Sequence, residues 1–287
     1  MRFGAITFIW TSPFATEELG LVDRVARLGF EVLEVAVEEA GLLDPEALRD
    51  ALERTGLGCV VVGFCTADRD LSSDDEEVRR AGVEYAKRCI DLAATAGAPL
   101  VAGPLHQAVG KARFVEREVR SAELERAVAG LAEVADHAGE RGISLAIEPL
   151  NRWESDMVNT VEQGLDLCDA VGRQNVGLLL DTFHQNIEEK RIGDAIRAAG
   201  ERLLHFHASE NDRGVPGSGH VPWPEVREAL ADVQYSGAVS LESFSSKIPG
   251  LAAAVSMWRP FYDDPDEFAR AGLEHLRATF GSELDSE

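Results

Sequence analysis

Four metal-capable residues close four successive apolar segments in the second half of the chain. The segments read LAIE, LLLD, HFH and SLE, and they end at Glu148, Asp181, His207 and Glu242. An isolated acid or imidazole at a strand end ordinarily faces solvent, and burying its charge without a partner is expensive. One cation shared by three carboxylates and an imidazole would compensate all four residues at once. The pattern therefore predicts a single metal site.

The composition of this ligand set bears on the metal. Three carboxylates and one imidazole favour Mn²⁺, Mg²⁺ or Co²⁺ in six-coordinate geometry, with two positions left for water or substrate. Structural zinc prefers cysteine and more histidine, so zinc is less favoured but stays open. We expect one divalent ion per subunit, Mn²⁺ first, with Co²⁺ or Mg²⁺ as alternatives. His205 shares strand parity with His207 but lies farther from the strand end, so we expect it to hydrogen-bond behind the metal or in the core.

These residues need a scaffold that brings four strand ends together. Short Leu-rich or β-branched segments predict eight buried parallel strands at residues 3–8, 32–37, 58–62, 100–102, 144–148, 176–181, 203–207 and 238–242. Segments with helical periodicity lie between them, at residues 17–28, 73–96, 122–139, 161–171, 192–199, 224–233 and 264–280. Alternating strands and helices predict a (β/α)₈ TIM barrel, in which every strand points its carboxyl end to the same mouth.

A doubly wound open sheet is the alternative fold, but no G-x-G-x-x-G motif follows the first strand. The 287 residues suit one barrel, and no repeat or low-complexity linker divides them, so we expect a single domain over residues 1–287. The segments 63–73 and 103–118 are rich in turn-forming residues. In a barrel such long loops lie over the active site.

The overall charge limits the classes of partner. The chain has 51 acidic and 28 basic residues, a formal net charge of −23. A field of that sign repels phosphate backbones and anionic lipids, so we expect no nucleic-acid partner and no membrane partner. The four cysteines lack C-x-x-C spacing, and neither a signal peptide nor a transmembrane segment is apparent. We therefore expect a cytoplasmic protein that acts on a small molecule.

Longer stretches around these residues resemble the ketose 3-epimerases. The strings that carry the resemblance are EPLNRWES at 148–155, LLLDTFH at 178–184, HFHASENDRG at 205–214 and SLESF at 240–244, and residues 70–88, 103–111 and 257–260 are similar as well. This group contains the D-tagatose, D-psicose (D-allulose) and L-ribulose 3-epimerases of the xylose-isomerase-like barrels. The resemblance implies metal-dependent epimerisation at carbon 3 of a free ketose by a homodimer or homotetramer.

The same resemblance implies individual roles. The four metal-capable residues would be the ligands, and two of them, Glu148 and Glu242, would also act as catalytic acid and base on opposite sides of the substrate carbon. Glu154, His184 and Arg213 occupy the places of the residues that hold the first few oxygens of the sugar. The reaction removes a proton next to a carbonyl and returns it on the other face through an enediolate, whose charge a divalent ion stabilises.

Three other readings stay open on the sequence. Aldose–ketose isomerisation or dehydration of a keto-inositol would use the same barrel and metal site, and the Glu154, His184 and Arg213 set argues against both. An endonuclease would need several metals, more histidines and a polyanionic partner that the net charge disfavours. A barrel that binds sugar without catalysis would ordinarily have lost a ligand or an acid, and none is missing here.

Overall fold

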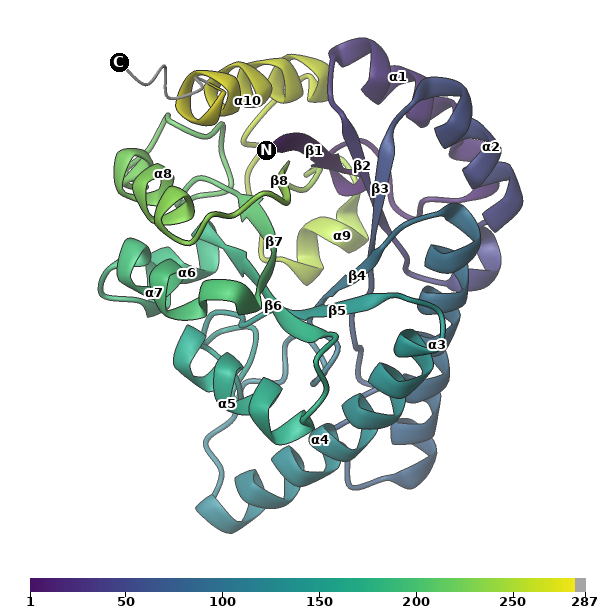
Figure 1. Ribbon diagram of the computed structural model, residues 1–287, viewed down its shortest axis with the longest axis vertical. Coiled ribbons are helices and arrows are strands. Elements are labelled where there is room, and N and C mark those ends of the chain that lie inside the picture. The colour runs from purple at the N-terminus through teal and green to yellow at the C-terminus, as the bar shows by residue number, and fades with distance from the viewer. Residues whose placement is uncertain (282–287) are drawn as a thin grey trace.

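Eight parallel strands close into a barrel in the computed structural model, which describes residues 1–281 (Figure 1). Each strand pairs with the next in chain order, and β8 pairs with β1 to close the sheet. The strands are β1 Arg2–Ile6, β2 Val32–Ala36, β3 Gly58–Val62, β4 Leu100–Gly103, β5 Ser144–Ile147, β6 Val176–Asp181, β7 Leu203–Ala208 and β8 Ala238–Leu241. The predicted (β/α)₈ barrel is confirmed, and the open sheet is wrong.

Helices surround the strands as an outer ring, while α9 lies inside that ring (Figure 1). Their bounds are α1 Gly20–Leu28, α2 Pro45–Thr55, α3 Glu76–Ala96, α4 Arg117–Gly139, α5 Val161–Val171, α6 Thr182–Glu188, α7 Ile192–Ala199, α8 Trp223–Asp232, α9 Pro249–Ala254 and α10 Pro265–Phe280. No helix among the described residues combines the length and the apolar character that crossing a membrane requires.

Local signals fix several of these boundaries. A capping box begins α5, in which the Thr160 hydroxyl and the Gln163 side chain each accept from the other residue's backbone N–H. Gly172 ends the helix in the left-handed conformation, with φ of 67°. Because both signals can be read from the sequence, α5 has the predicted bounds. By contrast, β1 stops at Ile6, because a 3₁₀ turn over Thr7–Ile9 replaces its last two expected residues.

The loops after β3 and β4 lie together at the carboxyl end of the barrel. Their backbones form a β-bridge at Cys65 and Ala108, and a second bridge joins Lys111 to Ser155 in the loop after β5. Gly103, the last residue of β4, has φ of +119°, and a Cβ there would collide with the carbonyl oxygen of Gly63. This close approach requires glycine, and it brings both loops over the barrel mouth, as predicted.

Candidate functional site

The four predicted metal residues converge at the carboxyl ends of the last four strands. Asp181 is the last residue of β6, His207 the second-last of β7, and Glu148 and Glu242 directly follow β5 and β8. One ligand atom from each residue lies within 4.8 Å of the others, and all four side chains are buried. The sequence thus predicted the grouping, although the predicted strands 144–148 and 238–242 are one residue too long and include the two glutamates.

The arrangement fits a divalent cation. Two of its atoms, Glu148 Oε1 and His207 Nδ1, have no hydrogen-bond partner among the described residues. Buried polar atoms are nearly always paired, so these two indicate a missing partner. Donor atoms about 2.1 Å from one ion lie at most about 4.2 Å apart, close to the spread seen here. Three carboxylates and one imidazole supply the oxygen-rich set that Mn²⁺, Mg²⁺ and Co²⁺ accept.

Arg213 is the cation that the structure itself places in this cluster. Its Nη1 lies 2.5 Å from Asp181 Oδ2 and 2.6 Å from Glu242 Oε2, and it also donates to Ser209 Oγ at 2.9 Å. The guanidinium stacks 4.0 Å from the centre of the Phe183 ring. Its backbone has a positive φ of 68°, and Ser243 Oγ donates to its carbonyl oxygen. Strained backbone of this kind concentrates at functional sites, where the surroundings hold it in place.

Burial and charge shift the pKa values of the two candidate acid–base groups in opposite directions. Burial, followed by repulsion from Glu242, raises the pKa of Glu148 well above its usual range. Burial would also raise the pKa of Glu242, but the charges of His207 and Arg213 outweigh it and lower the pKa below the usual range. Two acids with separated pKa values in one pocket are suited to proton exchange. A divalent ion among them would lower both values.

His184 presents a defined nitrogen to the site. Asp181 caps the start of helix α6, which carries His184: its Oδ1 accepts from the Phe183 backbone N–H, and its Oδ2 accepts from Arg213. The backbone N–H of Asn151 donates to His184 Nδ1 at 3.1 Å, so the ring proton is on Nε2. Burial, then the charge of Arg213, lowers the pKa of His184 to about 3. The ring is therefore neutral, and its Nε2–H points into the cluster.

Glu154 completes the predicted set of seven. It lies in the loop after β5, where Asn151 Nδ2 donates to its Oε1 at 2.7 Å. Glu154, His184 and the two candidate acid–base glutamates line one pocket of about 230 Å³. The rest of its wall is mostly apolar and comes from the loops after β1, β3, β4 and β8 and from α9; its members include Phe8, Phe64, Val109, Phe244, Leu251 and Val255.

Two residues of the site were missed by the sequence analysis. Asn151 holds both His184 and Glu154, but an asparagine in a loop gives no signal of its own. Glu34 of β2 lies behind His207, with Oε1 2.5 Å from His207 Nε2. A signal for Glu34 was present, because it is a lone acid in the strand VLEVA. His205 is confirmed as a buried hydrogen-bonding residue, since its Nε2 lies 2.8 Å from the same carboxylate.

Comparisons with known proteins agree with this geometry. The model of the xylose isomerase-like TIM barrel family matches residues 22–279. D-psicose 3-epimerase of Agrobacterium fabrum is 33% identical over 289 residues, which cover 98% of this chain and 100% of that protein. L-ribulose 3-epimerase of Mesorhizobium japonicum is 33% identical over 288 residues, covering 99% and 95%.

Solved structures extend the similarity to three dimensions. The crystal structure of D-allulose 3-epimerase from Methylomonas sp. superposes with a TM-score of 0.92 at 30% identity, over 98% of each chain. The similarity covers 98% or more of this chain in both sequence and fold. The chain therefore belongs to the xylose isomerase-like TIM barrel family and, within it, to the ketose 3-epimerases.

Proposed function

We propose that this chain is a metal-dependent ketose 3-epimerase, an isomerase that interconverts the carbon-3 epimers of a free ketose. The observation that carries the proposal is the convergence of three buried carboxylates and one imidazole, of which Glu148 and Glu242 line a small pocket. Two atoms of this group have no hydrogen-bond partner among the described residues. The names of the relatives support substrates of the D-psicose/D-fructose, D-tagatose or L-ribulose type.

Glu148, Asp181, His207 and Glu242 would hold one divalent ion, with Mn²⁺ as the first candidate and Co²⁺ or Mg²⁺ as alternatives. When bound, the ion would act as a Lewis acid that stabilises negative charge developing on the substrate oxygens. The ligand geometry supports this assignment because the four donor atoms already lie within 4.8 Å of one another.

Glu148 and Glu242 would exchange the proton at carbon 3. They come from β5 and β8, three strands apart around the barrel, and both face the same pocket. A substrate carbon between them would lose its proton to one carboxylate and receive a proton from the other on its opposite face. No net proton is consumed, so each turnover in one direction leaves the pair ready for the reverse direction.

His184 and Arg213 would hold the first oxygens of the sugar. The Nε2 of His184 and the Nη2 of Arg213 lie 3.3 Å apart, and both atoms carry protons to donate. Among the described residues neither atom has a hydrogen-bond acceptor, so a ligand oxygen beside the pair could accept from both. Glu154, on the same pocket, would accept from a hydroxyl near carbon 1, which would fix the reacting carbon between the two acid–base glutamates.

The pocket wall favours a small, uncharged sugar. A volume of about 230 Å³ is below the range of about 300–1,000 Å³ typical for larger ligands. Among the described residues that line the pocket, none is Lys or Arg, and the Arg213 guanidinium nearby is already paired with two carboxylates. A phosphate group would therefore find no free cation, and we propose that the substrate is an unphosphorylated ketose.

The decisive experiment is an epimerisation assay with added Mn²⁺, with D-fructose, D-psicose, D-tagatose and L-ribulose offered separately and products resolved by chromatography. We expect at least one ketose to be converted to its carbon-3 epimer, and the relative rates to identify the preferred substrate. Conversion to an aldose, or dehydration of a keto-inositol, would assign the isomerase or dehydratase reaction instead. Turnover in a rigorously metal-free sample would overturn the mechanism.

We also propose that residues 1–287 form one domain and that the enzyme works in the cytoplasm as a homodimer or homotetramer. Light scattering coupled to size-exclusion chromatography measures the oligomeric state, with an expected mass of two or four times the 31.1 kDa chain. A mass equal to one chain at micromolar concentration would reject the oligomer.

A further inference from the structure

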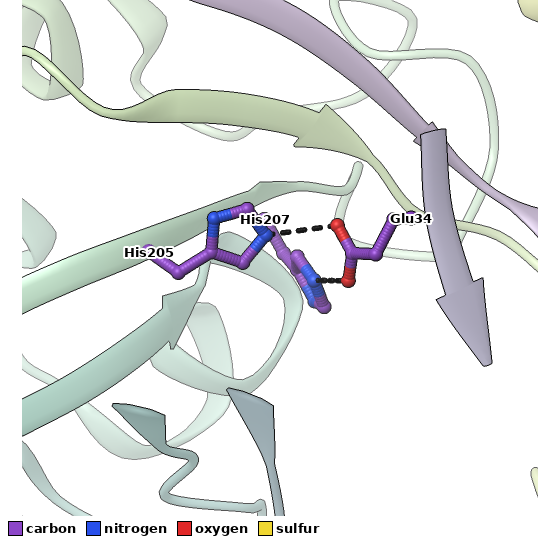
Figure 2. A group of neighbouring side chains, drawn as sticks. All are labelled: Glu34, His205 and His207. Atoms are coloured by element: carbon purple, nitrogen blue, oxygen red, sulfur yellow. Dashed lines mark hydrogen bonds and ion pairs between the residues drawn. The ribbon is translucent and has the colours of Figure 1, made fainter. Parts of the chain in front are cut away.

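An acid that is not part of the proposed ligand set lies inside the barrel, directly behind it. Glu34 is the third residue of β2, all five residues of the strand are buried, and Glu34 itself is 0% exposed. Figure 2 shows its carboxylate pointing from β2 toward two imidazole rings on β7. In the barrel, β8 and β1 lie between these two strands, so Glu34 reaches across the interior.

The two oxygens of Glu34 are divided between the two histidines. Oε1 lies 2.5 Å from His207 Nε2, and Oε2 lies 2.8 Å from His205 Nε2. A carboxylate only accepts hydrogen bonds, so each Nε2 must carry the proton and donate it. The His205 and His207 rings stand edge to face, with centres 5.2 Å apart, so each ring also packs against the other.

This arrangement determines which nitrogen of His207 faces the candidate metal site. With the proton of Nε2 engaged by Glu34, Nδ1 is the nitrogen whose lone pair is available for an ion. Nδ1 is also the ring atom that has no hydrogen-bond partner in the part of the chain that the structure describes, and it lies 3.3 Å from Glu242 Oε2 and 3.9 Å from Glu148 Oε1. The hydrogen bond from Nε2 to Glu34 therefore selects the tautomer of His207 that leaves the lone pair of Nδ1 available.

Packing alone does not require an acid at position 34. Its strand neighbours Val32, Leu33 and Val35 are apolar and almost completely buried, and an apolar side chain avoids the desolvation of a charge. Replacing a buried ion pair by apolar residues is often neutral or stabilising. A fully buried carboxylate with both oxygens bonded to imidazoles is thus better explained by what it does for those rings than by its contribution to the core.

We propose that Glu34 is a positioning residue that fixes the ring orientation and tautomer of His207, so that Nδ1 is presented to the metal. This inference rests on the proposed metal-dependent function. A separate metal site made of Glu34, His205 and His207 is disfavoured by distance. An ion about 2.1 Å from both a nitrogen and an oxygen would hold them about 3 Å apart, farther than the two contacts observed.

The test compares Mn²⁺ affinity, measured by isothermal titration calorimetry on metal-free protein, in four forms of the full chain. These are the wild type, Glu34→Gln, Glu34→Leu and the control Glu123→Gln, which changes a buried acid of α4 outside the site. We expect one ion per chain in the wild type and about 10- to 100-fold weaker binding by Glu34→Leu. Glu34→Gln retains one acceptor oxygen, so its loss should be smaller, and the control should bind like the wild type.

The visible absorption of bound Co²⁺ provides a second readout, because it reports the ligand geometry and is indifferent to a general loss of stability. We expect an altered spectrum in both Glu34 variants and an unaltered one in Glu123→Gln. If Glu34→Leu does not fold, the comparison of Glu34→Gln with the control decides.

Four outcomes can be told apart. Weaker binding confined to the Glu34 variants supports the inference. Equal affinity and equal Co²⁺ spectra in all forms that fold overturn it and leave the metal-dependent function intact. Two ions per wild-type chain, falling to one in the variants, also overturn it, because Glu34 would then be a ligand. A wild type that binds no Mn²⁺, Co²⁺ or Mg²⁺ overturns the proposed function itself.

Discussion

Two groups of mostly buried charges lie near the barrel mouth, and each contains three carboxylates. The mouth cluster consists of Glu148, Asp181, His207, Arg213 and Glu242. The loop cluster consists of Asp70, Lys111, Arg113, Arg120, Glu123 and Asp156, from the loops after β3, β4 and β5 and the start of α4. The two clusters share acidity and low exposure, but they differ in how completely their charges are paired.

In the loop cluster three cations balance three acids. Glu123 alone has Lys111 Nζ at 3.1 Å, Arg113 Nη2 at 2.8 Å and Arg120 Nη1 at 2.9 Å. Lys111 Nζ lies 2.8 Å from Asp70 Oδ2, and Asp156 forms ion pairs with both Arg113 and Arg120. Such a network joins three loops to one helix, and nothing in its charge balance calls for a ligand.

In the mouth cluster three acids face one arginine and one histidine, and two buried atoms have no hydrogen-bond partner within residues 1–281. A protein that needed this region only for stability would gain by removing one of the acids. Incomplete pairing of buried charges, rather than acidity or burial, therefore distinguishes the candidate site from the structural network.

The largest expected effect is on turnover, from Glu148→Gln or Glu242→Gln. Each change removes one of the two groups proposed to exchange the proton, which typically lowers kcat by about 10²- to 10⁴-fold. Glu148→Gln removes an acid whose pKa burial and Glu242 raise, so the free energy of unfolding of the metal-free protein should be unchanged or higher. Glu242→Gln should lower it, because Arg213 and His207 lose an ionised partner. Steady-state kinetics at saturating Mn²⁺ and urea unfolding in EDTA measure the two quantities.

The metal content of these variants must be determined alongside, since both residues are also proposed ligands. A variant that retains stoichiometric Mn²⁺ and turns over at the wild-type rate would sink the acid–base assignment. A variant that binds Mn²⁺ more weakly but regains wild-type turnover once Mn²⁺ saturates it would keep the ligand role and reject the separate catalytic role.

Metal removal is expected to act on the mouth cluster alone. EDTA should abolish activity, and Mn²⁺ or Co²⁺ should restore it. A ligand that binds only the folded state at 100 times its Kd stabilises that state by about 2.7 kcal/mol, so the metal-loaded protein should unfold at higher urea. Asp181→Asn should lose most of this increment, whereas Glu123→Gln should retain it. An equal increment in both variants would show that the ion binds elsewhere.

Glu123→Gln is the substitution in the loop cluster that matches Glu148→Gln in the mouth cluster, because each replaces a buried glutamate by glutamine. It leaves Lys111 and two arginines facing a neutral amide, and removing one partner from buried charged hydrogen bonds costs about 1–3 kcal/mol. We expect that loss in urea unfolding, with kcat and KM unchanged at 25 °C. A fall in kcat without a fall in stability would mean that the loop cluster takes part in the reaction.

Most of the fold could be predicted because its signals are local. The bounds of α5 and α7 agree with the prediction to the residue, since both are amphipathic segments with clear starts and ends. Helices α2, α6 and α9 have no counterpart among the predicted helical segments. Helices α6 and α9 have seven and six residues, too few for helical periodicity to stand out, and the residue that caps α6, Asp181, had already been assigned to the metal.

The candidate site divides in the same way. The grouping of Glu148, Asp181 and Glu242 followed from their places at strand ends, which a barrel brings together. The contact between Glu34 and His207 joins residues 173 positions apart across the barrel interior, and no local pattern encodes it. The parity of Glu34 with Val32 and Ala36 indicates an inward-facing charge, but its partner becomes known only when the barrel is closed.

The smallest effect we expect is a pH dependence of stability in the loop cluster. Burial by itself would raise the pKa of Asp156, but hydrogen bonds from Arg120, Gln107 and Arg113 outweigh it and lower the pKa to about 2, from an ordinary value of 3.8. The folded state therefore holds this proton more weakly than the unfolded state. The stabilisation by ionised Asp156 is fully present above about pH 4 and is lost as the pH falls toward 2.

Asp156→Asn removes the titrating group while keeping its size. At pH 5 the variant should be less stable than the wild type in urea unfolding, because Arg113 and Arg120 lose an ionised partner. The difference should narrow steadily between pH 4 and pH 2, since the wild-type carboxylate then becomes protonated and loses the same interaction. A difference that stays constant over this interval would mean that the arginines contribute no charge-dependent stabilisation at Asp156. The loop cluster would then contain equal numbers of acids and cations without gaining stability from this pairing.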